Sequence, residues 1–326
     1  MKAIVRHRYG SPDVLRLEDV DMPVVGDDQV LIRVRAASVN AYDWHVLRGL
    51  PYLVRIEQGL REPKTSTTGV DLAGEVEAVG KDVSEFRPGD AVFGERDGAF
   101  AEYVSGRAVN FAPKPSNLTF EQAAAVPMAG YTALQALRDK GQIQAGQKVL
   151  VNGASGGVGS FAVQIASAVG AEVTGVCSTR NLELVRSIGA DHVIDYTGDD
   201  FTRGAERYDL IIDIAATRPL RDCRRVLTPN GRLVIVGAAV GHADGRWIGP
   251  MIRPAAAAII SRFVKERLLL PFLAHRSKDD LLVLKSMIES GTVTPLIDRA
   301  YPLAQTAEAI RYVEAGHARG KVVITI

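Results

Sequence analysis

A glycine-rich turn between an apolar strand and a helix constrains the fold of this chain most. The run NGASGGVG, residues 152–159, follows the apolar segment KVLVN. It precedes a predicted helix over Gly157–Val169, whose apolar face comprises Val158, Phe161, Ile165 and Val169. From Lys148 onward, further apolar strands alternate with helices. Such alternation predicts a parallel sheet with helices on both faces.

The glycines of this turn have separable tasks. Gly153 opens the tight turn, Gly156 lets the backbone approach a pyrophosphate, and Gly159 lets the helix press on the sheet. The free N–H groups at the helix start then face the anion. The spacing departs from GxGxxG because Ala154 replaces a glycine. The alternative, a glycine-rich turn with no ligand, is disfavoured by the surrounding strand–helix units. We therefore expect dinucleotide contacts from Ser155, Gly156, Gly157 and Val158.

The second strand of this region, EVTGVC, ends without the acid that usually binds a ribose. Ser178, Thr179 and Arg180 follow it instead. Hydroxyls can donate to a 2′-phosphate, and a guanidinium can pair with one. Tyr196, after the next strand, could add a hydroxyl or stack on adenine. Arg180 could also be a solvated charge, but a cation at a helix start is unfavourable without an anion. The pattern predicts NADP(H) as cofactor rather than NAD(H).

The first third of the chain reads as short β-rich runs separated by Gly and Pro. This pattern predicts an antiparallel, barrel-like domain. The last run, GKVVITI, has the same β-character, so we expect the tail to return to that domain. The predicted division is residues 1–124 with 278–326 for the barrel-like domain, and residues 125–277 for the nucleotide-binding domain.

Composition excludes several classes of protein. The 326 residues are 47% hydrophobic and 24% charged, and the net charge of +1 offers no basic surplus for nucleic acid. The first residues lack the apolar core of a secretory signal, and charges interrupt the longest apolar run before it could span a membrane. The two cysteines, Cys177 and Cys223, lack the spacing of a metal site and cannot build a disulfide framework. We expect a cytoplasmic, reduced protein.

Three segments resemble the medium-chain dehydrogenase/reductase superfamily, and look like its quinone oxidoreductase branch. They are AVPMAGYTALQAL, NGASGGVG and GKVVITI. The resemblance implies an α/β fold: a Rossmann-type doubly wound parallel sheet plus an N-terminal GroES-like β-barrel domain, completed by the C-terminal tail. It also implies a homodimer, and further cofactor contacts at Asn40, Thr132, Gly237 and Lys321.

Departures from the zinc alcohol dehydrogenases of this superfamily predict a protein without zinc. Asn40 stands where those enzymes carry a ligand cysteine, and Val70 where they carry a ligand histidine. No cysteine lies near the third ligand position, and the four-cysteine lobe is absent. Without a Lewis acid, oxidation of an unactivated alcohol becomes difficult. Hydride transfer to a quinone or an α,β-unsaturated carbonyl remains feasible.

Asn40 and Tyr52 are the candidate catalytic residues. Asn40 could donate its amide to the acceptor oxygen as charge develops, between the two predicted domains. Its alternative role is that of a turn residue at a strand end. For His45 packing is favoured, and for Asp43 an Asx-type turn. No residue stands out as an acid, so solvent could supply the proton.

Two other functions stay open: an NADP-dependent dehydrogenase of an unusual alcohol, and an NADPH-binding protein with little turnover. Segment Gly241–Ser277 could line an acceptor site, a dimer seam or a membrane-facing patch, with core or dimer packing favoured.

Overall fold

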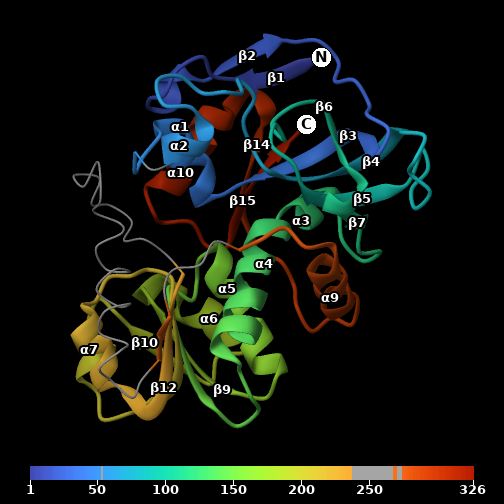
Figure 1. Cartoon of the computed structure of the whole chain (residues 1–326). Coiled ribbons are helices and arrows are strands. Elements are labelled where there is room, and N and C mark those ends of the chain that lie inside the picture. The colour runs from blue at the N-terminus through green and yellow to red at the C-terminus, as the bar shows by residue number, and fades with distance from the viewer. Residues whose placement is uncertain (53, 237–266, 270–273) are drawn as a thin grey trace. The chain divides into compact units, whose positions relative to one another are not determined.

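The computed structural model describes residues 1–52, 54–236, 267–269 and 274–326. They form two compact units (Figure 1). Unit 1 comprises Met1–Tyr131 and His275–Ile326, and unit 2 comprises Thr132–Ala274. Most of segment Gly241–Ser277 lies outside the described residues. No helix in the described part of the chain is long and apolar enough to cross a membrane.

Unit 2 is built on a parallel sheet. The strand order is β10-β9-β8-β11-β12-β13, and every pairing along it is parallel. The strands are β8 (Lys148–Asn152), β9 (Glu172–Cys177), β10 (His192–Asp195), β11 (Tyr208–Asp213), β12 (Leu227–Ile235) and β13 (Arg267–Leu269). The predicted parallel sheet is confirmed. Strand β8 lies where the order reverses direction, the point at which such sheets bind ligands.

Helices follow the strands of unit 2 as the alternation predicted. They are α5 (Gly157–Ala168), α6 (Leu182–Ser187) and α7 (Leu220–Arg225), with a π-helical turn over Ala136–Gly141. Helix α5 connects β8 to β9 and helix α7 connects β11 to β12, so the two connections lead toward opposite edges of the sheet. Because such crossovers are right-handed, the two helices cover opposite faces (Figure 1). Leu150, Ile211 and Leu233 point to the same face of the sheet and are fully buried in a core that includes Leu220 and Cys223 of α7.

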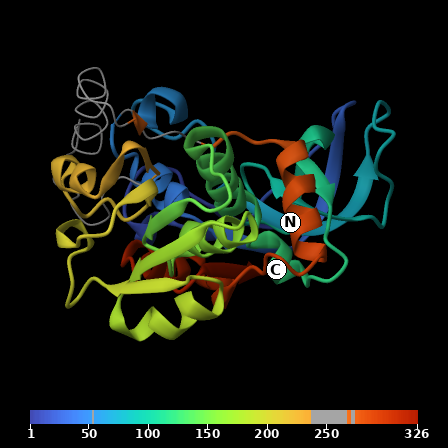
Figure 2. The same ribbon diagram turned by 90° about the horizontal axis from the view of Figure 1, so that it is seen from below.

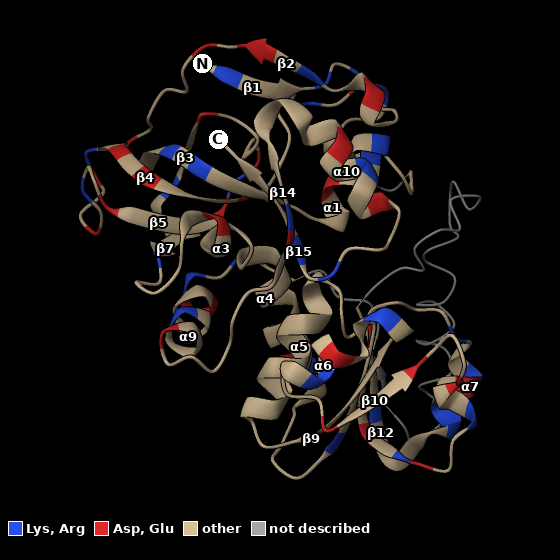
Figure 3. Ribbon diagram, turned by 180° about the vertical axis from the view of Figure 1, so that it is seen from behind, with Lys and Arg blue, Asp and Glu red and all other residues tan. Residues whose placement is uncertain are grey.

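Unit 1 contains a mainly antiparallel sheet. Its order is β14-β15-β3-β4-β5-β7, with β6 also paired to β3, while β1 and β2 pair separately. The strands are β1 (Lys2–Val5), β2 (Arg16–Asp19), β3 (Gln29–Val39), β4 (Asp71–Val79), β5 (Ala91–Glu95), β6 (Tyr103–Arg107), β7 (Phe111–Pro113), β14 (Ile297–Pro302) and β15 (Lys321–Thr325). The charged outer faces of β3 and β4 form ion pairs across the strands (Figure 3): Arg33 with Glu77 and Arg35 with Glu75.

The tail returns to unit 1, as predicted. Strand β15 lies between β14 and β3 and pairs antiparallel with β3, where Val322 faces Val39. The helices of unit 1 are α1 (Ala41–Arg48), α2 (Val54–Gln58), α3 (Phe120–Ala124), α9 (Lys278–Glu289) and α10 (Thr306–Glu314), and α4 (Pro127–Gln135) runs from unit 1 into unit 2. Helix α9, orange in Figure 2, ends where Asn117 donates to the Ile288 carbonyl at 2.8 Å.

Local signals explain where two of these helices begin. Thr119 accepts from the Gln122 N–H at 3.3 Å, and Gln122 accepts from the Thr119 N–H at 3.0 Å. Together these two bonds form a capping box, which fixes the start of α3. Asn40 precedes α1, and the Asp43 carboxylate accepts its backbone N–H at 2.7 Å. Asp43 thus has the local, structural role expected of it.

Candidate functional site

The glycine turn of unit 2 has the backbone geometry that a pyrophosphate requires. Gly153 has φ +94°, a left-handed conformation that favours glycine. A Cβ on Gly159 would lie 2.0 Å from the Gly153 carbonyl oxygen, so the close approach of helix and turn excludes a side chain. Among the described residues, a Cβ on Gly156 would meet only that same oxygen, at 3.5 Å, so this position has room for a ligand. The leading N–H groups of α5 have no partner within the helix. Gly153 and Gly159 thus have the turn and packing geometry predicted, whereas the pyrophosphate contact at Gly156 stays a prediction.

Asn181 joins the glycine turn to the end of β9. This buried side chain donates to Ser155 Oγ at 2.9 Å and to Ser178 Oγ at 3.3 Å. Its Oδ1 atom is buried and makes no hydrogen bond within the described chain. Sequence reasoning missed Asn181, although it directly follows the Ser178–Arg180 run. The predicted contacts Ser155 and Ser178 thus share one amide.

The residues after β9 and β10 lie side by side. Thr179 donates its hydroxyl to Asp195 Oδ2 at 2.6 Å, so this hydroxyl already has a protein acceptor. Arg180 and Tyr196 are exposed, and the Tyr196 N–H donates to the Cys177 carbonyl at 3.0 Å. Sequence reasoning expected no carboxylate here and missed Asp195. The signal was available, because Asp195 ends the strand next to β9.

The remaining predicted cofactor contacts of unit 2 are less well defined. Thr132 lies on α4 and is half-buried. Gly237 falls outside the described residues. The loop after β11 is held by Asp213, whose Oδ1 accepts from Asn152 Nδ2 at 2.8 Å and from the Ala216 N–H at 3.0 Å. This loop is therefore tied to the carboxyl end of β8.

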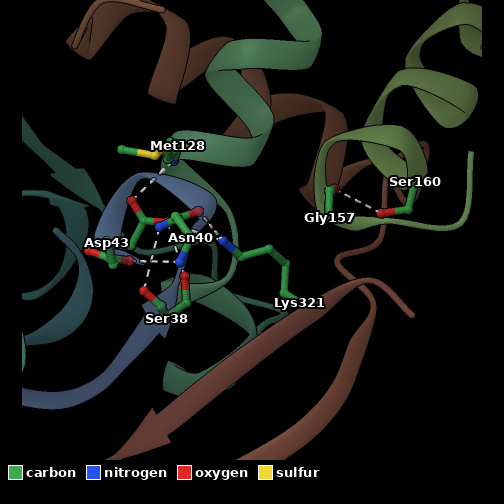
Figure 4. A network of polar contacts seen from close by, with 8 residues as sticks. Ser38, Asn40, Asp43, Met128, Gly157, Ser160 and Lys321 are labelled. Atoms are coloured by element: carbon green, nitrogen blue, oxygen red, sulfur yellow. Dashed lines mark hydrogen bonds and ion pairs between the residues drawn. The ribbon is translucent and has the colours of Figure 1, made fainter. Parts of the chain in front are cut away.

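Unit 1 contains a buried polar network around Asp71 (Figure 4). The Asp71 carboxylate accepts from Asn40 Nδ2 at 2.9 Å, from Ser38 Oγ at 3.0 Å and from the Met128 N–H at 3.2 Å. Lys321 Nζ lies 3.5 Å from Asp71 Oδ2 and also donates to Asn40 Oδ1. Several donors on one carboxylate stabilise its negative charge. We call Ser38, Asn40, Asp71 and Lys321 the Asp71 network.

This network changes the role expected for Asn40. Its amide donates to Asp71 and, at 3.5 Å, to the Ser38 carbonyl, while its oxygen accepts from Lys321. Both N–H bonds therefore point to protein acceptors, which argues against donation to a substrate oxygen. Lys321 is 3% exposed and is likewise held by Asn40 and Asp71. Asp71 was missed, although it directly follows Val70 in the sequence.

Two further buried carboxyls lie in unit 1. Burial raises the pKa of Asp43 to about 8, although the hydrogen bond from the Asn40 N–H opposes this shift. Burial, followed by the Asp71 charge, also raises the pKa of Glu95, against the effect of Arg276. Arg276 Nε lies 3.0 Å from Glu95 Oε2, and its Nη2 lies 2.6 Å from Asp97. Unit 1 thus contains carboxyls whose protonated forms persist to unusually high pH.

The other candidate side chains of unit 1 make packing contacts. Tyr52 is half-buried, and the Arg55 guanidinium lies 4.7 Å from its ring centre. His45 stacks on Trp44, with ring centres 3.6 Å apart, and its Nδ1 lies 2.9 Å from the Leu50 carbonyl oxygen. Burial lowers the pKa of His45. The packing role expected for His45 agrees with these contacts.

The residues that the resemblance aligns with the ligands of the zinc alcohol dehydrogenases have different surroundings. Asn40 belongs to the Asp71 network, and Val70 is buried at 1% exposure. Within residues 1–52, 54–236, 267–269 and 274–326, no three His, Cys, Asp or Glu side chains are grouped as a metal site. The donor set of the network, an amide, an ammonium and one carboxylate, does not suit tetrahedral zinc.

The glycine turn, by contrast, suits a dinucleotide. Gly156 has room for a ligand, and Asn181 Oδ1 has no hydrogen-bond partner in the part of the chain that the structure describes. Ser178 and Arg180 follow the neighbouring strand. Gly156, Gly157 and Val158 could therefore hold the pyrophosphate. Ser178 and Arg180 could hold a 2′-phosphate.

Comparison with known proteins agrees with this fold. Residues 26–116 match the alcohol dehydrogenase GroES-like domain, and residues 188–324 match the zinc-binding dehydrogenase family. A chloroplastic NADPH-dependent alkenal/one oxidoreductase of Arabidopsis thaliana is 33% identical, over 99% of this chain and 79% of the relative.

Two solved structures cover this whole chain with a TM-score of 0.86. One is a quinone oxidoreductase from Coxiella burnetii, 30% identical with 99% of that chain covered. The other is described as an NAD-dependent alcohol dehydrogenase, 29% identical with 100% of that chain covered. The chain belongs to the medium-chain dehydrogenase/reductase superfamily, in its quinone oxidoreductase-like branch.

Proposed function

We propose that this protein is an NADPH-dependent oxidoreductase that reduces quinones or α,β-unsaturated carbonyl compounds by hydride transfer, without zinc. The observation that carries the proposal is Asn40 and Val70 at the two zinc-ligand positions, in a chain whose relatives include an NADPH-dependent alkenal/one oxidoreductase. An electrophilic acceptor needs no Lewis acid to take a hydride.

The nicotinamide cofactor supplies the hydride, and unit 2 supplies its binding site. Gly156 leaves room for the pyrophosphate, and the N–H groups of Gly157 and Val158 face it. Ser178 and Arg180 contact the 2′-phosphate. Arg180 is exposed at the end of β9, where a phosphate can reach it.

In unit 1, Asn40 acts as a positioning residue rather than as a donor to the acceptor. Its carbonyl oxygen fixes Lys321, whose ammonium places positive charge beside Asp71. The two side chains then act as one unit. Because a misplaced group near the reacting atoms can cost about 100-fold in rate, loss of either should lower kcat by up to about 100-fold while the Kd for NADPH stays within about twofold. The double variant Asn40→Ala/Lys321→Met should be little worse than the poorer single variant.

The test of function is a single-turnover experiment in which stopped-flow spectroscopy monitors oxidation of bound NADPH by a benzoquinone, a conjugated enal or a conjugated enone. A parallel experiment mixes the protein and NADP⁺ with a simple alcohol and monitors formation of NADPH. We expect rapid oxidation by at least one conjugated acceptor and no reaction of the alcohol. If no acceptor oxidises NADPH faster than buffer, the protein is a binding protein rather than a reductase. Turnover of the alcohol instead would favour the dehydrogenase, the activity named for one of the similar structures.

Glycine variants separate loss of cofactor binding from loss of fold. Gly156→Ala adds a methyl group in open space, so it should fold normally and bind NADPH at least about tenfold more weakly. Gly204→Ala is the matched control, because its Cβ would lie 3.8 Å from its nearest neighbour in the same unit. Unchanged affinity in Gly156→Ala would show that the dinucleotide does not approach this turn.

A homodimer and a cytoplasmic location complete the proposal. Both follow from the resemblance and composition described above. Sedimentation equilibrium measures the first, and fractionation of the source cells measures the second.

A further inference from the structure

Asp195 lies beside the proposed 2′-phosphate contacts because two parallel strands end together. Asp195 pairs in register with Cys177, the last residue of β9. Ser178 and Thr179 therefore leave β9 next to the Asp195 side chain. In many dinucleotide sites, a carboxylate about 20 residues after the glycines binds the ribose. Strand β9 does not end in such a carboxylate, but the adjacent strand β10 ends in Asp195.

Hydrogen bonds from Thr179 and Thr197 fix the Asp195 carboxylate in this place. Thr179 donates to Oδ2 at 2.6 Å, and Thr197 donates to Oδ1 through its hydroxyl at 2.7 Å and its N–H at 3.0 Å. These hydrogen bonds lower the pKa of Asp195, and the bond from Thr179 has the largest effect. The carboxylate is thus ionised at neutral pH. Asp195 is only partly buried and Thr179 and Thr197 are exposed, so the charge is open to a ligand.

This arrangement has two effects on a 2′-phosphate. The Thr179 hydroxyl hydrogen is already directed to Asp195, so donation to phosphate must compete with a charge-assisted hydrogen bond. A phosphate within reach of Thr179 also lies about 5 Å from the Asp195 charge. Two like charges at that separation change a binding constant about fourfold even in water-like surroundings.

We propose that Asp195 is a specificity-determining residue that opposes binding of the 2′-phosphate and keeps the cofactor preference of this protein small. The inference rests on the proposed function, since it concerns the same dinucleotide site. Ser178 and Arg180 provide the attraction, and Asp195 with Thr179 opposes it. The neutral variant Asp195→Asn retains an acceptor for Thr179 and Thr197 but removes the charge.

The experiment measures the Kd of the apoprotein for NADPH and NADH at pH 8 and low salt, by titration calorimetry. Asp195→Asn should bind NADPH at least about fourfold more tightly, with NADH affinity changed less than about twofold. The control Asp199→Asn removes an exposed charge four residues along the same loop and should change neither value by more than about twofold. Melting temperatures establish that each variant is folded, and Asp195→Ser serves as a second neutral variant.

Two outcomes would overturn the inference. NADPH affinity that is unchanged or weaker in a folded Asp195→Asn protein would show that Asp195 merely orders the loop. An equal gain in Asp199→Asn would show a general charge effect. Failure of wild type and variants alike to bind either dinucleotide would instead overturn the proposed function, and the two failures are therefore distinguishable.

Discussion

The buried ion pair of the Asp71 network gives the most exacting test of the structure. The Lys321 and Asp71 side chains are 3% and 0% exposed, and Nζ lies 3.5 Å from Oδ2. At this distance, and with an effective dielectric constant of about 20, the attraction amounts to about 5 kcal/mol. Lys321→Met preserves most of the apolar stem and removes the charge. The Asp71 carboxylate then stays buried without its cation.

We expect Lys321→Met to lower the free energy of unfolding by about 3–5 kcal/mol, because an uncompensated buried charge is costly. Urea unfolding followed by tryptophan fluorescence, in a Trp247→Phe background so that Trp44 at the unit 1 core gives the signal, measures this change. Asp71→Asn in the Lys321→Met background should recover part of the loss, since it removes the unpaired charge. The coupling free energy of this double-mutant cycle should exceed about 1.5 kcal/mol.

The matched control is Lys2→Met in the same unit. Lys2 pairs with Asp19 at 3.1 Å, but the two side chains are 52% and 76% exposed. Solvent screens such a pair, so its loss should cost under about 1 kcal/mol. If Lys321→Met costs no more than Lys2→Met, the reasoning about the Asp71 network is wrong.

Three other predictions concern pH, cofactor and metal. Burial raises the pKa of Asp43 to about 8 from an ordinary value of 3.8, so the native state keeps a proton that the unfolded chain releases. The stability that this proton gives to the native state is complete below about pH 4 and is lost as the pH rises to about 8. Between pH 5 and 8 this loss lowers the free energy of unfolding by up to about 1.4 kcal/mol per pH unit, and Asp43→Asn should abolish this slope when stability is measured by urea unfolding. An unchanged slope would contradict the raised pKa of Asp43. Arg180→Ala should weaken NADPH binding about tenfold and leave NADH binding within about twofold, as measured by calorimetry; equal losses for both cofactors would remove Arg180 from the phosphate site. Elemental analysis should find well under one zinc per chain, and chelators should leave activity unchanged; stoichiometric zinc lost together with activity would refute this expectation.

Most of the fold could be predicted because each element carries a local signal. The alternation of apolar strands and helices specified the sheet of unit 2, and the capping-box residues Thr119 and Gln122 are a local signal for the start of α3. Even the return of the tail followed from the β-character of residues 321–325. These features depend on periodicity and capping, which act over a few residues.

The site was less predictable because its contacts join distant segments. The Asn40 amide is hydrogen-bonded to Lys321 and Asp71, and no local sequence pattern relates these two residues to Asn40. Likewise, Asp195 matters only because β10 lies next to β9 with its end in register. Residue types at a motif suggest a ligand, whereas the partners of those residues decide which of them are available to it.

The position of β15 has a consequence for how the protein is made. Lys321 and Asn40 are 281 positions apart, and all of unit 2 lies between their strands in the sequence. Unit 2 is one continuous stretch and can fold as soon as it leaves the ribosome. In unit 1, β3 emerges long before β15, so residues 36–39 of β3 lack their β15 partners and Asp71 lacks its cation for most of synthesis. Nascent chains halted before β15 should therefore protect unit 2 from protease while leaving unit 1 open to cleavage and in need of chaperones.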